Sequence, residues 1–299
     1  MMKLQTKIDI PASPWKIGYE DKILMTGSCF SDEIGEQMKQ HYLHVISNPF
    51  GTLYNPLSIA QALQMTEMPE LVEYQGLWHS MAHHGAFSRA SKEETMQIVR
   101  DSIDTMQKAL AEASVVIVTF GTAWIYEWKG TIVGNCHKLP AEYFTRRRLG
   151  VEEIVAAWKP ILEKYLDKHW LFTVSPIRHI KDGLHENELS KATLLLAAEQ
   201  LGNYFPSYEI VLDELRDYRF YADDLVHPSS MAVNYIWERF AETYCTPETQ
   251  KELKELYQFW QDCHHVLLHP NTPDAQAFSK RLEQRKQELI RKNRYENII

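Results

Sequence analysis

The feature that most constrains the fold is the six-residue run Val115–Phe120, which reads VVIVTF. All but its last residue are β-branched, and polar and apolar residues do not alternate along it. Strands of this kind are buried on both faces, whereas a strand with one face in water alternates between apolar and polar residues. Because sheets covered on both faces are mainly parallel, we expect an α/β protein.

Further short apolar runs alternate along the chain with segments of helical periodicity. Besides Val115–Phe120, we expect strands at residues 22–26, His44–Ser47, 170–174 and 208–212. We expect helices at residues 32–42, 58–65 (capped by Ser58), 93–113, 151–167, 187–203 and 229–243. Parallel neighbours need long crossover connections, so this alternation predicts a doubly wound three-layer sandwich of about five parallel strands.

Two regions lie outside this alternation. Residues 124–140 contain Trp-Lys-Gly between apolar flanks, which predicts a hairpin inserted after the third strand. From residue 247 onward the pattern is helical only, amphipathic at first and charge-rich toward the end. We therefore expect an α/β domain over residues 1–246 and a helical extension over residues 247–299. The extension either packs on its own domain or is a surface for self-association.

The charge of the chain limits its partners. It has 32 Lys and Arg against 40 Asp and Glu, a formal net charge of −8. Nucleic acids and acidic membranes bind basic surfaces, so neither is an expected partner. No apolar run approaches the ~20 residues that cross a bilayer, and the N-terminal sequence does not resemble a signal peptide. We expect a cytoplasmic protein.

The cysteines and histidines do not predict a metal site. The four cysteines are scattered and form no CxxC pair, which favours free thiols. His79 and His83 are four residues apart, but no nearby Cys or Glu completes a ligand set, and Gly85 favours a loop. That loop, with His84, is either a lid that contacts substrate or a polar surface loop. We expect no metal and no organic cofactor.

Ligands of open parallel sheets bind beyond the carboxyl ends of the strands. The segments in that position are residues 27–31, 48–52, 121–124, 175–179 and 223–228. Hydroxyl groups, an asparagine, a carboxylate and a histidine are thus expected at one edge of the sheet. Arg178 is suited to an anionic or hydroxylated substrate, with an ion pair to Asp182 or Asp213 as the alternative.

Ser28 follows a buried strand and a glycine and precedes an expected helix. A helix N-terminus stabilises a developing anion, and a serine hydroxyl becomes nucleophilic when a base removes its proton. Asp224 and His227 are separated by two residues, so the carboxylate can reach one ring nitrogen and leave the other free as that base. The structural alternatives are a helix cap for Ser28 and a satisfied histidine at a helix start for His227.

Residues 27–31, Gly-Ser-Cys-Phe-Ser, resemble the signature of the GSCFA family, with Ser31 where the family name has alanine. Segments 48–51, 120–124, 135–138, 175–176 and 218–222 are also similar to family segments, so the resemblance extends over most of the α/β domain. The order of Ser28, Asp224 and His227 is similar to that of the SGNH/GDSL hydrolase superfamily. This resemblance implies a flavodoxin-like three-layer sandwich with a serine-hydrolase site.

The superfamily resemblance implies a role for each site residue. Ser28 is the implied nucleophile, His227 the general base and then acid, and Asp224 its orienting carboxylate. The implied oxyanion hole consists of the Ser28 N–H, the Gly51 N–H and an Asn side chain after the third strand. The third strand is followed by Gly-Thr-Ala instead, so Thr122 or Asn135 is expected to replace that side chain.

Together these residues predict a serine-dependent ester hydrolase or acyltransferase that works through an acyl-Ser28 intermediate. The expected substrates are O-acyl esters, such as acetyl esters, of small molecules or carbohydrates. Substrate contacts are expected from His84, Trp124, His137 and Arg178. Cys29 is a second candidate nucleophile, because a thiolate is intrinsically more nucleophilic than a hydroxyl group. Only one of these two adjacent side chains can face His227. The alternative function is a non-catalytic binding protein that retains the pocket.

Overall fold

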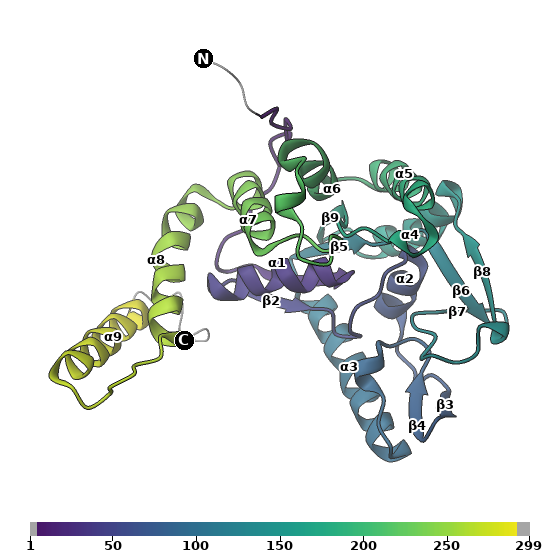
Figure 1. The fold of residues 1–299 in the computed structure, drawn as a ribbon, viewed down its shortest axis with the longest axis horizontal. Helices are drawn as coiled ribbons and strands as arrows, with labels where there is room; N and C mark the ends of the chain where they lie inside the picture. Colours follow the sequence, from purple (N-terminus) through teal and green to yellow (C-terminus); the bar gives the residue numbers. More distant parts are fainter. Residues whose placement is uncertain (1–4, 292–299) are drawn as a thin grey trace.

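A five-stranded parallel sheet forms the centre of the protein (Figure 1). The computed structural model describes residues 5–291. The strands are β1 (Lys22–Gly27), β2 (His44–Ser47), β5 (Val115–Phe120), β9 (His169–Val174) and β10 (Tyr204–Phe205), in the spatial order β10-β9-β5-β1-β2. β5 is buried along its whole length, as its sequence predicts, and it pairs with β1 and β9.

Helices cover both faces of the sheet. One face carries α1 (Cys29–Gln40) and α7 (Ser230–Tyr244), and the other carries α2 (Pro56–Gln64), α3 (Lys92–Glu112), α4 (Val151–Lys164) and α5 (Leu184–Leu201). Successive side chains of a strand point to opposite faces, so Val115 and Ile117 belong to the first core cluster while Val116 and Val118 belong to the second. The expected α/β fold with helices on both faces is confirmed.

The fifth strand is not where its sequence places it. Residues 208–212 are helical: α6 (Ser207–Glu209) continues into a wide helical turn, Ile210–Leu215. The sheet is completed instead by β10, which pairs with β9 over only two residues. Ile210, Val211 and Leu215 are buried by the helical turn, and a short apolar run does not distinguish a buried strand from a buried helical segment. The expected cap Ser58 is also wrong, because Asn55 caps α2 and its Oδ1 accepts from the Ser58 N–H.

Two small antiparallel sheets are added to this core. The expected insertion after β5 is present as β6 (Trp124–Trp128) and β7 (Thr131–Val133), and a third strand that the sequence did not predict, β8 (Phe144–Arg148), pairs with β6. A second hairpin, also not predicted, consists of β3 (Leu71–Tyr74) and β4 (Leu77–Ser80). The three-stranded sheet β7-β6-β8 lies beside the main sheet (Figure 1). Its residues form one wall of the cleft described below.

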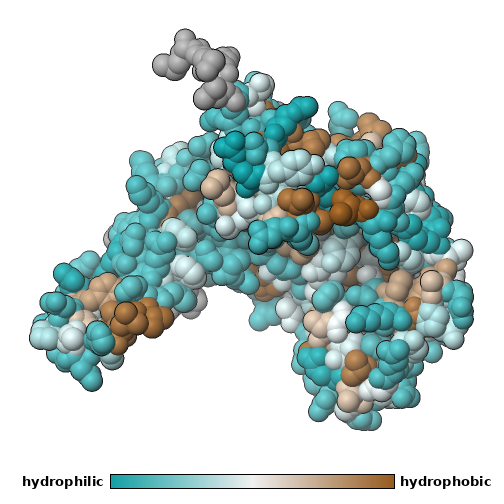
Figure 2. Space-filling view, in the orientation of Figure 1, coloured by the Kyte–Doolittle hydropathy of each residue, from teal (hydrophilic) through white to brown (hydrophobic). Residues whose placement is uncertain are grey.

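The C-terminal helices α8 (Pro247–His264) and α9 (Pro273–Arg291) form an arm that extends from the α/β core (Figure 1). The surface of the arm is mostly hydrophilic (Figure 2). α8 packs against α1, where Tyr257 stacks on His41 at 4.7 Å between ring centroids and Phe259 is fully buried. The expected helix over residues 274–299 is present as α9 up to residue 291, and its last eight residues lie outside the described range. Self-association through the arm stays a prediction.

No helix within residues 5–291 has both the length and the apolar character needed to cross a membrane.

Candidate active site

Asp224 and His227 form a hydrogen-bonded pair in the loop before α7. Asp224 Oδ2 lies 2.6 Å from His227 Nδ1, and Asp224 Oδ1 accepts from the backbone N–H groups of Val226 and His227 at 2.9 and 3.0 Å. The hydrogen bonds from the backbone and ring of His227 lower the pKa of Asp224 to about 2. The carboxylate therefore orients the imidazole and leaves Nε2 free to act on a second group.

That second group is the thiol of Cys29. Cys29 Sγ lies 3.9 Å from His227 Nε2. Ser28 is fully buried, and its Oγ has no hydrogen-bond partner among the described residues. Ser28 is the N-cap of α1 with an extended backbone, and adjacent side chains on an extended backbone point in opposite directions. The structure thus brings Cys29 to His227, contrary to the expectation that Ser28 faces it, and the identity of the nucleophile itself stays a prediction.

The thiol of Cys29 is held in its protonated form. Burial and the nearby carboxylate of Glu33 raise its pKa to about 11, although the backbone N–H groups at the start of α1 act in the opposite direction. Glu33 lies one helical turn after Cys29, and burial raises its own pKa to about 7. A protonated thiol is a weak nucleophile, so chemistry at Cys29 requires a base at the position that His227 occupies.

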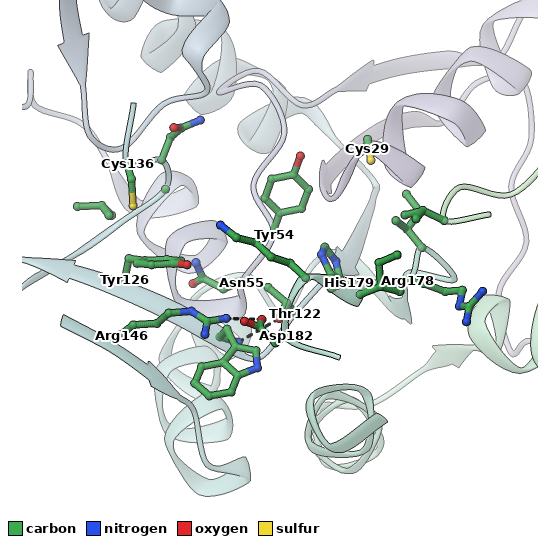
Figure 3. A pocket seen from close by; sticks show the side chains of 18 of the residues that line it. Cys29, Tyr54, Asn55, Thr122, Tyr126, Cys136, Arg146, Arg178, His179 and Asp182 are labelled. Atoms are coloured by element: carbon green, nitrogen blue, oxygen red, sulfur yellow. Dashed lines mark hydrogen bonds and ion pairs between the residues drawn. The ribbon is translucent and has the colours of Figure 1, made fainter. Parts of the chain in front are cut away.

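Cys29 and His227 line a cleft of about 510 Å³, and Cys29 lies at one end of it (Figure 3). Its walls come from the loops after the parallel strands and from the inserted sheet β7-β6-β8. They include Tyr54, Thr122, Trp124, Asn135, Arg146 and His179. Burial lowers the pKa of His179 to about 3, so its ring is neutral, and its buried Nε2 has no partner among the described residues. The cleft can hold a substrate against the thiol with aromatic and polar groups around it.

The expected oxyanion donors are only partly at the cleft. Thr122 and Asn135 line it, but Thr122 Oγ1 is engaged by Ser190 Oγ and by the backbone N–H of Trp124. Asn135 Oδ1 accepts from the backbone N–H of His137, which leaves the Asn135 side-chain N–H groups as donors. The first N–H groups of α1 have no acceptor inside the helix and lie beside Cys29.

Gly51 is not among the residues that line the cleft, and its expected role as an oxyanion donor stays a prediction. Its N–H donates to the carbonyl of Asn48 at 2.7 Å. Gly51 has a φ of +71°, and a Cβ there would lie 2.4 Å from His84 Cβ. Glycine is therefore needed at this position for a tight turn against the His84 loop.

Two of the four expected substrate contacts lie elsewhere. Trp124 and Arg178 line the cleft, whereas His84 and His137 do not. His84 Nδ1 accepts from the backbone N–H of Ala86 in the turn Gly85–Phe87. His137 is buried, its Nε2 lies 2.8 Å from the Ser80 carbonyl, and burial lowers its pKa to about 4. Both histidines are satisfied within the fold, and residues 5–291 contain no group of three or more His, Cys, Asp or Glu arranged to hold a metal.

Arg178 pairs with neither Asp182 nor Asp213. Its backbone N–H donates to the Val226 carbonyl at 3.1 Å, and its Nη1 donates to the Leu225 carbonyl at 3.0 Å. These carbonyls belong to the two residues between Asp224 and His227. Arg178 therefore contacts the carbonyls of the turn between Asp224 and His227, while Asp224 contacts two backbone N–H groups of the same turn.

Two polar side chains fix the loops of the site: Lys191, which sequence reasoning missed, and Asn48, which it placed at the sheet edge without predicting its contacts. Lys191 is fully buried, and its Nζ donates to the carbonyls of Gly121 and Ser175 at 2.7 Å each, which joins the ends of β5 and β9. Burial lowers its pKa to about 7. Its place three residues before the buried Leu194, on the apolar face of α5, is a signal that could have identified it. Asn48 binds the N–H of Gly27 through Oδ1 and the carbonyl of Ser28 through Nδ2.

The comparisons with known proteins bear on the family alone. No curated protein matches this chain closely enough to count as a relative. The family model described as "GSCFA family" matches residues 22–240, which include the sheet, the cleft, Cys29 and the Asp224–His227 pair. Since this match covers well over half of the chain, the protein belongs to the GSCFA family.

Proposed function

We propose that the protein is a thiol-dependent acyl-transfer enzyme, an ester hydrolase or acyltransferase, whose nucleophile is Cys29. One observation carries this proposal: the line of hydrogen-bonding groups from Asp224 through His227 to the Cys29 thiol at the end of an open cleft. A carboxylate, an imidazole and a nucleophile in that order are the parts of a catalytic triad, which is recognised by geometry rather than by residue type.

The reaction follows from these positions. His227 Nε2 takes the S–H proton as Cys29 Sγ bonds to the acyl carbon, and the carbonyl oxygen becomes an oxyanion. The N–H groups at the start of α1 and the side-chain N–H of Asn135 are the donors available to it. The C–O bond then breaks, the alkoxide leaves with the proton from His227, and a thioester remains on Cys29. Water, or an acceptor alcohol, gives its proton to His227, attacks the thioester and restores the thiol.

We further propose that the domain is related to the SGNH/GDSL hydrolases, with cysteine in place of their serine. In chain order the parallel strands lie 2-1-3-4-5, the arrangement of flavodoxin-like doubly wound sheets. The proposed nucleophile follows the first strand and the Asp-x-x-His pair follows the last, as in that superfamily. By this analogy the substrates are O-acyl esters of small molecules or carbohydrates.

The test is to trap the acyl group. The protein is incubated with 4-nitrophenyl acetate, quenched in acid and mapped by peptide mass. Cys136 is a matched internal control, because it lines the same cleft and burial raises its pKa to the same value, about 11, but no histidine ring nitrogen lies within hydrogen-bonding distance of its thiol among residues 5–291. We expect acetyl on Cys29 well before Cys136. His227→Ala should slow the acetylation of Cys29 by roughly 10²–10⁴-fold, the usual contribution of a general base.

Two other outcomes would contradict the proposal. Acetyl on Ser28 would restore the serine mechanism that the sequence predicts. Acetylation of Cys29 no faster than Cys136, in folded protein, would favour a binding protein that retains the cleft.

A further inference from the structure

The wall of the cleft opposite Cys29 presents mainly hydrogen-bond donors. We call this the donor wall and define it as Trp124, Asn135, Arg146 and Lys181, all of which line the cleft. Trp124 Nε1, which can only donate, is buried and has no partner among residues 5–291. Asn135 has its acceptor oxygen occupied by the His137 N–H, so its free groups are donors. Arginine and lysine side chains have donors only.

The donor wall has few free hydrogen-bond acceptors for a hydroxyl group. Asp182 is the one carboxylate among the described residues that line the cleft, and its Oδ2 is engaged by Arg146 at 2.5 Å (Figure 3). A sugar hydroxyl both donates and accepts, so a site built for it supplies acceptors as well as donors. A carboxylate or phosphate only accepts, which matches this wall.

The charged groups of the cleft also favour an anionic ligand at the donor wall. The Arg146 guanidinium lies over the rings of Trp124 and Tyr126, at 4.1 and 5.3 Å from their centroids, which fixes it in place. Lys181 has no carboxylate within 4 Å among residues 5–291, and its charge acts to lower the pKa of Cys136. The acidic groups Asp32, Glu33 and Asp224 lie instead around Cys29 and His227. Although the protein has a net charge of −8, the far end of its cleft thus has two cationic side chains, Arg146 and Lys181, against one carboxylate, Asp182.

We propose that the substrate carries an oxyanion, a carboxylate or a phosphate, that binds the donor wall while its acyl group lies at Cys29. The inference rests on the proposed function for the acyl group. It goes further because it names the chemistry of the other end of the substrate. A local excess of positive charge raises the local concentration of anionic substrates, which increases the rate of encounter.

The test uses Cys136, which lines the cleft on the side away from Cys29 (Figure 3). Its alkylation rates with iodoacetate and with iodoacetamide are measured by peptide mass, since these reagents differ in charge but react alike. The ratio of the two rates reports the potential at the donor wall. We expect Lys181→Gln and Arg146→Gln each to lower this ratio by roughly threefold at low salt, the effect of one nearby charge in a wet cleft. The wild-type ratio should fall toward theirs at 1 M salt, where the Debye length is about 3 Å.

The matched control is Lys129→Gln, which makes the same charge change in the same inserted sheet. Lys129 lies over Trp128 in the turn between β6 and β7 and does not line the cleft. This variant should leave the ratio unchanged. A ratio that all three variants change equally, or that none changes, would overturn the inference.

Competing ligands identify the source of the oxyanion. Inorganic phosphate and succinate are tested separately for protection of Cys136 against iodoacetamide, in wild type and in Lys181→Gln. Protection by phosphate supports a phosphorylated substrate, and protection by succinate a carboxylated one. Protection by neither overturns the proposed site. The alkylation and protection of Cys136 do not require ester turnover. Failure of acylation at Cys29 would therefore refute the proposed function without affecting the test of anion binding at the donor wall.

Discussion

Ser28→Ala separates the two adjacent candidates for the nucleophile. The Ser28 side chain is fully buried, and its hydroxyl has no partner among the described residues. Its backbone makes the local contacts: the N–H donates to Thr119 O at 3.1 Å, and the carbonyl accepts from the N–H of Ser31 at 2.8 Å and from Asn48 Nδ2 at 3.4 Å. Alanine keeps all three, together with the Cβ that packs against Gly121.

The magnitude follows from the orphaned hydroxyl. A buried polar group without a partner costs about 1–3 kcal/mol, and removing its oxygen leaves a gap smaller than a methyl group. We expect Ser28→Ala to stabilise the protein by about 1 kcal/mol, which raises the Tm by about 2 °C for a chain of this size. The rate of acetylation at Cys29 should stay within about twofold of wild type, since no proton transfer passes through Ser28.

Thermal unfolding and acetyl mapping are measured on the same preparations of Ser28→Ala, Cys29→Ala and wild type. Cys29→Ala should unfold close to wild type, because Cys29 is only half-buried, and should lose the rapid acetylation. A folded Ser28→Ala that no longer acetylates, beside a Cys29→Ala that does, would refute the reasoning. A Tm lowered by several degrees in Ser28→Ala would show that the hydroxyl has a partner after all.

Three further predictions follow from the groups around the pair. Asp224→Asn should slow acetylation of Cys29 by roughly 10²–10⁴-fold, and because the pKa of Asp224 is about 2, the wild-type rate measured from about pH 4 upward should show no titration of this carboxyl. Arg178→Ala should lower kcat with KM nearly unchanged in steady-state ester hydrolysis, and Arg178→Lys should recover part of it; a rise in KM alone would assign Arg178 to substrate binding instead. Lys191 has a folded pKa of about 7 against about 10.4 when unfolded, so the unfolded chain binds more protons between these values and wild-type stability should rise with pH there. The free energy of unfolding, measured with urea, should rise by up to about 1.4 kcal/mol per pH unit more in wild type than in Lys191→Met. Parallel plots of unfolding free energy against pH for the two proteins would contradict the lowered pKa of Lys191.

The parts of the fold that the sequence predicted correctly are those with long, consistent patterns. β5 and β2 coincide with their expected bounds, and the helices on the sheet differ from expectation by a few residues at their ends. The errors lie in short segments. Residues 208–212 have strand composition, but the chain buries them in a helical turn after a two-residue strand. β8 reads FTRRR, and its pairing with β6 depends on tertiary contacts that no local pattern contains.

The candidate site divides in the same way. The Asp224–His227 contact is local, and two intervening residues suffice to predict it. Gly51 was expected at the cleft from the superfamily resemblance, His84 from its place in a histidine-rich loop, and His137 from a segment similar to the family. Gly51 donates to the nearby Asn48 carbonyl, whereas the His84 N–H donates to the Phe50 carbonyl and His137 Nε2 contacts the Ser80 carbonyl, both of which are distant in the sequence. Lys191 and Arg178 act on carbonyl groups, which every residue has, so sequence alone does not reveal their partners.

The choice between Ser28 and Cys29 depends on where α1 begins. Gly27 has a φ of +140°, and a Cβ there would lie 2.1 Å from Thr119 O, so the chain can make this turn only with glycine. The Gly27 N–H is held by Asn48 Oδ1 and the Ser28 N–H by Thr119 O, which fixes the backbone on both sides of the turn. The Ser28 side chain is then buried close to Gly121, and Cys29, the first residue of the helix, lines the cleft. A shift of one residue in the start of α1 would exchange the two side chains. The hydrogen bonds of Asn48 and Thr119 therefore determine which of the two side chains, Ser28 or Cys29, His227 can reach.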